Sequence, residues 1–140
     1  MTEFEKIKCN MEESVEIENL EHIQLLVDTF YGKIRKDDLL ADIFNDIIQN
    51  RWPEHLEKMY RFWQTILLGE HTYTGRPLLP HLPLPVEKMH FERWIYLFEQ
   101  TLDELFHGEK VELARWQANR MAMMFNMKID YYKQSQLNNP

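Results

Sequence analysis

Cysteine, glycine and long apolar runs are scarce in this chain, and each scarcity removes a class of protein. The one cysteine, Cys9, cannot form an internal disulfide, so the chain needs no oxidising compartment. Its four glycines form no Gly-rich dinucleotide-binding motif. No segment reaches the roughly 18 apolar residues that span a membrane, and the charged N-terminus does not read as a signal peptide. We therefore expect a cytoplasmic protein with no membrane partner.

Positive charge is also in deficit. The chain has 16 Lys and Arg against 23 Asp and Glu, a formal net charge of -7. Such a chain gains nothing from a phosphate backbone, which argues against nucleic acid as a partner. The 140 residues fit one domain, and 13% of them are aromatic. This aromatic stock suits a core built around a large flat guest, although an ordinary aromatic-rich core has the same composition.

Apolar residues recur at helical spacing along five segments, and no strand-like alternation competes with them. The predicted helices start after Asn19, cover Leu39–Gln49, run from Trp52 to a stop at Gly69, cover about Val86–Phe106, and follow Gly108. The predicted fold class is all-α, with one domain over residues 19–133. Residues 1–18 form a polar leader, either mobile or a loosely docked helix, and residues 134–140 a flexible tail.

Two histidines stand in strongly structured apolar surroundings. His55 lies on the apolar stripe of the third helix, and His81 lies in a turn where four prolines forbid a long helix. A helix followed by a short stiff connection can place two imidazoles on opposite sides of a slot, as a haem requires. For each histidine alone, a half-buried structural role is the alternative. The slot would be lined by Phe44, Met59, Phe62, Trp63, Leu78 and Leu82.

The proline-rich turn suits an iron ligand, because it restricts the backbone that holds the imidazole. No Asp or Glu occurs in the five residues before His81, so a backbone carbonyl is expected to accept its second ring N–H. No Cys-x-x-Cys-His motif is present, which excludes a haem attached as in c-type cytochromes.

Further polar side chains lie on inward stripes of other helices. Tyr31 and Trp94, together with His55, could donate hydrogen bonds to a gas that gains partial negative charge on binding. Plain core packing is the alternative for Tyr31 and Trp94. Lys58 and Arg76 could meet a haem propionate, or be solvated surface charges. The remaining histidines, His22, His71, His90 and His107, are expected at the surface.

Taken together, these stretches resemble the truncated haemoglobins, and within them the third group, found in bacteria. The resemblance covers about residues 19–130. It is carried by Phe30-Tyr31-Gly32-Lys33-Ile34-Arg35-Lys36-Asp37, Ile43-Phe44-Asn45, Trp52-Pro53-Glu54-His55, Phe62-Trp63, Leu67-Leu68-Gly69-Glu70, Tyr73-Thr74-Gly75-Arg76-Pro77-Leu78, His81-Leu82-Pro83-Leu84-Pro85 and Phe91-Glu92-Arg93-Trp94.

The resemblance implies a short globin fold, two helices packed over two, around a b-type haem. It implies His81 as the proximal iron ligand, with Tyr31, His55 and Trp94 around the bound gas. It also implies that Phe44 packs on the haem ring and that Lys58 meets a propionate.

Three functions follow as alternatives. The protein could bind dioxygen, and other small gases such as NO or CO, at a pentacoordinate haem iron. It could instead be a haem enzyme that converts nitric oxide to nitrate or handles peroxide, in which case an external reductase is needed. Without haem, it would be a helical interaction domain. The sequence leaves open whether the protein is an enzyme.

Overall fold

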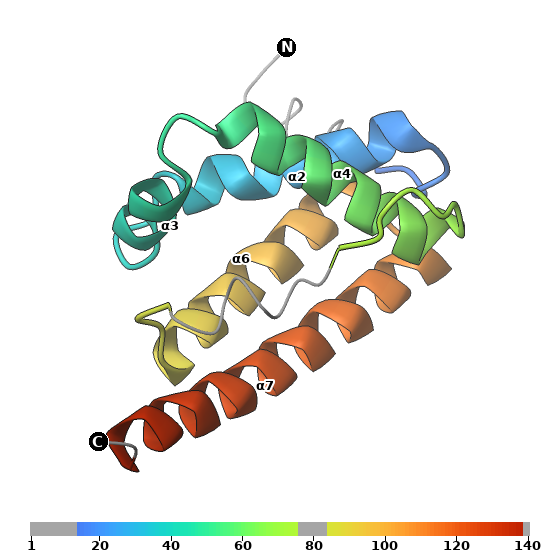
Figure 1. Cartoon of the computed structure of the whole chain (residues 1–140). Coiled ribbons are helices and arrows are strands. Elements are labelled where there is room, and N and C mark those ends of the chain that lie inside the picture. The colour runs from blue at the N-terminus through green and yellow to red at the C-terminus, as the bar shows by residue number, and fades with distance from the viewer. Residues whose placement is uncertain (1–13, 76–83, 139–140) are drawn as a thin grey trace.

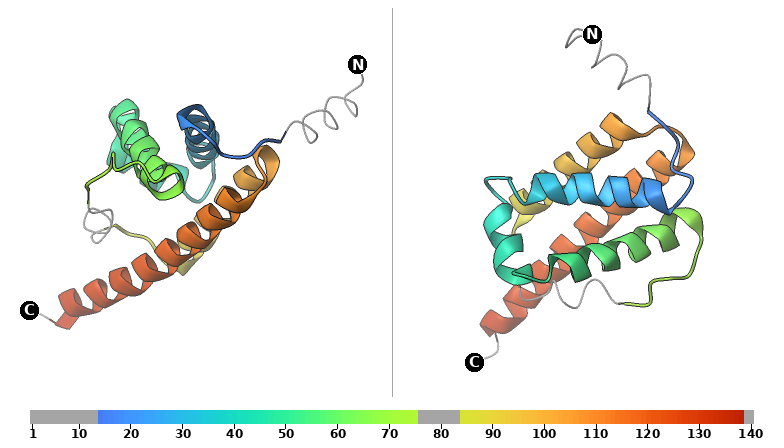
Figure 2. Two further views of the ribbon diagram at one scale, coloured as in Figure 1. Left: turned by 90° about the vertical axis from the view of Figure 1, so that its right-hand side faces the viewer. Right: turned by 90° about the horizontal axis from the view of Figure 1, so that it is seen from above.

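The computed structural model describes residues 14–75 and 84–138, and these form a two-layer sandwich of helices (Figure 1). Helices α2 and α4 lie side by side in one layer and cross α6 and α7 in the other, as two further views show (Figure 2). The short helix α3 joins α2 to α4 at one end. This arrangement confirms the predicted all-α fold. The helix bounds are α2 Leu20–Ile34, α3 Ala41–Ile48, α4 Trp52–Leu68, α6 Lys88–Leu105 and α7 Glu109–Asn138.

Local sequence signals set most of these bounds. The Asn19 side chain accepts a hydrogen bond from the His22 backbone N–H at 3.0 Å, which caps α2. Gly69 ends α4 with φ of 70°, a left-handed conformation that favours glycine. α3 is shorter than predicted, because Gln49 already leaves the helical region with φ of 54°. The predicted fourth helix begins at Lys88 rather than at Val86.

The end of the predicted leader packs on the domain. Ile17 is 0% exposed and belongs to the core. The Val15 backbone N–H donates to the carbonyl of Leu105 at 3.3 Å, and its carbonyl accepts from His107 at 3.0 Å. Residues 14–18 therefore differ from the expected mobile or helical leader. Two backbone hydrogen bonds hold them extended, and one apolar side chain anchors them.

Large rings join the two layers at the centre of the core. Phe98 of α6 is 1% exposed and stacks on Trp63 of α4 with ring centroids 5.0 Å apart. Phe30 of α2 meets Phe98 edge to face at 5.1 Å. These contacts fix the spacing of the layers beside the cavity described below.

The two ends of α7 are fixed differently. Near its start, Arg115 pairs with Asp103 of α6 at 2.7 Å. Farther along, the Lys133 ammonium donates to the Val86 carbonyl at 2.7 Å, and the helix continues past this contact to Asn138.

In the described part of the chain, no helix combines the length and apolarity that crossing a membrane requires.

Candidate functional site

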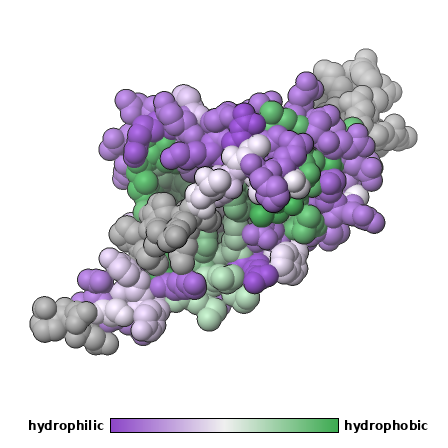
Figure 3. Space-filling model, turned by 45° about the vertical axis from the view of Figure 1, so that its right-hand side comes forward, coloured by the Kyte–Doolittle hydropathy of each residue, from purple (hydrophilic) through white to green (hydrophobic). Residues whose placement is uncertain are grey.

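A cavity of 220 Å³ lies between the two layers. On the face drawn in Figure 3, hydrophobic residues gather between the polar outer surfaces of the layers. From α2, α4 and the segment joining them, the wall receives Tyr31, Leu40, Ile43, Phe44, Ile47, Ile48, His55, Met59, Phe62 and Trp63. From the other side it receives Leu84, Val86, His90, Phe91, Trp94, Met121, Ala122 and Phe125. Among the described residues, the lining includes no Asp, Glu, Lys or Arg, so these walls are apolar apart from a few neutral polar groups.

Tyr31 is held inside this cavity by aromatic rings on several sides. It is only 6% exposed, and its ring centroid lies 5.1 Å from that of His55, 5.9 Å from Trp52 and 6.2 Å from Phe44. Burial raises the pKa of Tyr31 well above its ordinary value. The phenol therefore stays protonated at neutral pH and keeps an O–H to donate.

Trp94 approaches the same cavity from α6. Its ring stacks parallel to Phe98, with 5.5 Å between centroids and an interplanar angle of 1°. Phe30 meets it edge to face at 5.3 Å. These two neighbours restrict the orientation of the indole, whose N–H can only donate.

His55 lies half-buried on α4 and lines the cavity between two other site residues. Its ring is perpendicular to both Tyr31 and Trp52, with centroids 5.1 Å and 5.7 Å away. The structure thus brings Tyr31, His55 and Trp94 to one cavity, as the sequence predicts. Four predicted pocket residues, Phe44, Met59, Phe62 and Trp63, line it as well.

The predicted iron ligand lies outside the described residues. His81 falls between residues 75 and 84, together with Leu78, Leu82 and Arg76, so their predicted roles stay predictions. Where the description resumes, Leu84 and Val86 line the cavity. Lys58 is exposed on α4 and is not among the lining residues, and its propionate contact also stays a prediction.

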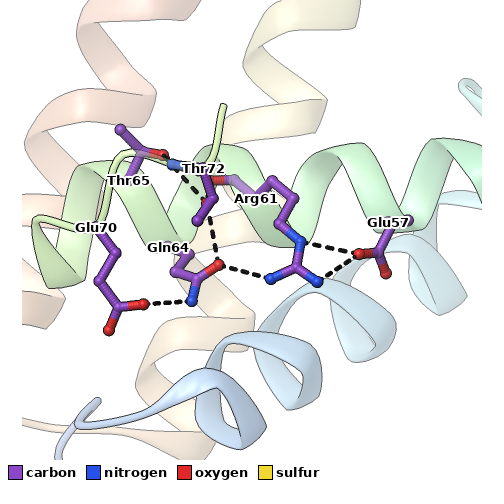
Figure 4. A network of polar contacts seen from close by, with 6 residues as sticks. All are labelled: Glu57, Arg61, Gln64, Thr65, Glu70 and Thr72. Carbon is purple, nitrogen blue, oxygen red and sulfur yellow. Dashed lines mark hydrogen bonds and ion pairs between the residues drawn. The ribbon is translucent and has the colours of Figure 1, made fainter. Parts of the chain in front are cut away.

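A polar network anchors the chain between α4 and residue 75 (Figure 4). The buried Gln64 donates to Glu70 at 2.6 Å and accepts from Arg61 and Thr72, each at 3.0 Å. Tyr73 then packs edge to face on Phe62 at 5.4 Å. The segment that leads toward residue 76 is therefore held against the same helix that carries His55.

His90 is a lining residue that the sequence analysis places wrongly at the surface. It is half-buried, and its Nδ1 accepts the Glu87 backbone N–H at 2.9 Å. In the neutral ring the proton is therefore on Nε2. The available signal is its position four residues before Trp94, which puts both on one helix face. Met121 and Phe125 of α7 also line the cavity, and the sequence analysis does not name them as pocket residues.

The chemistry of the lining fits a haem. Flat aromatic rings, thioethers and branched apolar side chains pack well on a large flat macrocycle, and the lining within residues 14–75 and 84–138 contains no carboxylate. Of the polar lining residues in these ranges, three are Tyr31, His55 and Trp94, and the fourth is His90. This is the donor set expected around a small ligand bound on one side of such a group.

Residues 16–130 match the bacterial-like globin family. The chain belongs to this family. A group 3 truncated hemoglobin of Campylobacter jejuni is 40% identical over 118 residues, which cover 81% of this chain and 93% of that protein. These findings confirm the resemblance stated from the sequence, and as a globin the chain is a haem-binding protein.

Two crystal structures show the same fold. That of a group III truncated hemoglobin from Campylobacter jejuni superposes with a TM-score of 0.76 at 38% identity, covering 83% of this chain and 94% of that one. That of a group II truncated hemoglobin from Bacillus anthracis gives 0.66 at 30% identity, covering 89% and 90%. The predicted truncated globin architecture is therefore confirmed.

Proposed function

We propose that this globin binds dioxygen, and other small gases such as NO and CO, in the cavity between its helix layers. The cofactor is a b-type haem, and the imidazole of His81 is its proximal ligand. The observation that carries the proposal is the convergence of a buried phenol, an indole and an imidazole on an otherwise apolar cavity. Haem iron supplies the coordination position at which a diatomic gas binds.

Tyr31 is the principal hydrogen-bond donor to the gas. Its raised pKa keeps the hydroxyl protonated, and its ring contacts with His55, Trp52 and Phe44 restrict where that hydroxyl can point. A hydrogen bond in such a site contributes about 1–1.5 kcal/mol, which slows ligand release by roughly tenfold.

Trp94 and His55 complete the polar part of the pocket. The Trp94 indole can only donate, so it favours a ligand that gains negative charge. Its stacking on Phe98 holds the ring in place. The apolar lining excludes water, which strengthens each donor because water competes less for it.

Two basic residues, Lys58 and Arg76, have a separate role in this proposal, which is to bind the haem propionates. Lys58 lies three residues after His55, hence on the same side of α4, and is exposed. We infer that its ammonium meets a haem propionate at the mouth of the cavity, with Arg76 as the second candidate. An ion pair in such an exposed position contributes orientation more than stability.

The optical spectrum of the haem-loaded protein tests the cofactor and its ligand. Ferric, ferrous and CO-loaded protein should show the spectra of a histidine-ligated b-type haem. His81→Ala should lose that signature or lose the haem, whereas His71→Ala, a change at an exposed histidine, should keep it. Unaltered ferrous spectra in His81→Ala would assign the proximal ligand elsewhere.

Stopped-flow measurement of gas release tests the donors. Tyr31→Phe and Trp94→Phe should each speed dioxygen release by roughly tenfold. Tyr96→Phe, which changes an exposed tyrosine on α6, should leave the rate unchanged. Wild-type rates in both pocket variants would remove these residues from the ligand site. Sustained consumption of nitric oxide once a reductase is supplied would instead favour the enzyme alternative.

A further inference from the structure

The last helix has an apolar face that no described element covers. Leu113, Trp116, Met123, Met127 and Leu137 of α7 are between 40% and 85% exposed. In Figures 1 and 2, the outer side of α7 forms an edge of the molecule. Isolated apolar residues at a surface are ordinary, but five of them on one helix face need an explanation.

This face lies directly opposite the face that α7 buries. The buried residues Ala114, Ala118 and Ala122 pack toward the rest of the domain. At about 100° per residue, the exposed stripe falls on the other side of the helix. It is therefore not the margin of the core but a second contact face.

The spacing along the stripe is that of a helix–helix seam. Starting at Leu113, steps of three and four alternate through residues 116, 120, 123, 127, 130, 134 and 137. A repeat of 3.5 residues keeps one stripe in line with a facing helix, as in coiled coils. The positions without an apolar residue hold Arg120, Asp130 and Gln134, all exposed.

We propose that this face binds α7 of a second copy of the same chain, antiparallel, to form a symmetric dimer. In the register that we infer, Arg120 of each copy lies opposite Asp130 of the other. The same register sets Met123 against Met127 and Leu113 against Leu137. Twofold symmetry makes each contact twice, so the dimer contains two Arg–Asp pairs.

Charge complementarity selects this register. Parallel pairing would set Arg120 against Arg120 and Asp130 against Asp130, which repel. Sliding the antiparallel pair by one heptad sets Arg120 against Met123 or against Leu137, and leaves the charges unpaired in an apolar seam. Unpaired charges at such positions are costly and select against a register. Arg120 already lies over the Trp116 ring, 5.1 Å from its centroid, and is thereby oriented in the single chain.

The C-terminal end of α7 is a further argument for a second copy of the chain as the partner. The helix continues beyond Lys133, its contact with Val86, and Leu137 there is 85% exposed. A helix end without tertiary contacts gains little stability on its own. In the inferred dimer this end lies along Leu113 and Trp116 of the second copy, which gives the last turn a surface to pack on.

Sedimentation velocity of the haem-loaded full chain over a range of concentrations tests the proposal. The wild type should shift from monomer to dimer as concentration rises. Arg120→Asp and Asp130→Arg should each weaken the dimer by about 100-fold, because each turns two charge pairs into like-charge contacts. The double variant Arg120→Asp/Asp130→Arg should restore dimerisation. Since these residues lie ten positions apart on one helix, no contact within one chain can produce that rescue.

Lys128→Asp is the matched control, since it reverses an exposed charge on α7 away from the stripe and should leave the dimer unchanged. Circular dichroism and the haem spectrum verify that each variant is folded. A wild type that stays monomeric at every concentration would overturn the proposal, and would assign the face to another occupant. A dimer that tolerates both single reversals, or one that the double variant fails to restore, would overturn it equally.

Discussion

The two walls of the cavity are built in different ways. The wall from α2 and α4 is a set of interlocked rings, in which Tyr31 contacts His55, Trp52 and Phe44. The wall that α7 supplies consists of Met121, Ala122 and Phe125, with no hydroxyl, amide or imidazole among them. The first wall fixes the direction of donor groups, whereas the second fixes only shape.

α6 contributes both kinds of residue, oriented polar groups and apolar side chains. It contributes the oriented indole of Trp94, and also His90, whose Nδ1 is occupied by the Glu87 backbone. The comparison indicates where substitutions should change ligand chemistry and where they should change only stability. Directional donors tolerate little change, because a hydrogen bond weakens steeply as its angle departs from linear. A thioether or methyl contact has no such angular requirement.

The largest effect is expected on stability, where the first wall meets α6. Phe98→Ala removes the ring that stacks on both Trp63 and Trp94 in the centre of the core. We expect a loss of about 3–5 kcal/mol in the free energy of unfolding, because the cavity left behind cannot close fully. Denaturant unfolding of the haem-loaded protein at fixed haem concentration measures it.

Tyr96→Ala is the control for that experiment, because Tyr96 lies on the same helix and is 60% exposed. Its effect should stay within about 0.5 kcal/mol. Equal losses in the two variants would mean that the Phe98 stack does not hold α4 and α6 together.

Helical periodicity predicts the fold well, for physical reasons visible at single residues. Asn19 and Gly69 act as the caps that their chemistry favours. Residues spaced by three and four positions on α4, such as His55, Met59 and Phe62, reach one cavity because a helix brings that spacing to one face. Spacing alone leaves open which of these residues contact the ligand, and the family resemblance predicts their roles.

Periodicity does not predict the position of a residue that depends on one side-chain contact or on backbone hydrogen bonds. Ile17 has only Val15 near it in a polar stretch, too short a pattern to predict an element, yet backbone hydrogen bonds at Val15 hold this segment against the core. The sequence around His90 is that of a surface histidine. In the structure its Nδ1 accepts the Glu87 backbone N–H, and the residue lines the cavity. Past Lys133 the sequence is polar, but Gln and Leu are adequate helix formers and α7 continues.

A smaller loss of stability is expected when His90, the lining histidine of α6, is changed. His90→Ala removes the acceptor of the Glu87 N–H at the start of α6 and should cost about 1 kcal/mol in unfolding free energy. His90→Gln should recover most of it, since glutamine at this position can accept the same hydrogen bond. Dioxygen release should match the wild type in both variants. Faster release in His90→Ala alone would make His90 a ligand donor and add a second oriented donor on α6 to Trp94.

The smallest effect is expected on the α7 wall, and it tests the comparison directly. Met121→Leu keeps the volume of the side chain and should change the unfolding free energy by well under about 1 kcal/mol, in the low range for volume-conserving swaps. Gas release should stay within about twofold of the wild type, against roughly tenfold for Tyr31→Phe, because no oriented donor is lost. Met59→Leu makes the same change on α4, beside His55, and so matches it across the cavity. If Met121→Leu altered release as much as Tyr31→Phe, the shape of the α7 wall would control the ligand as strongly as the donors do.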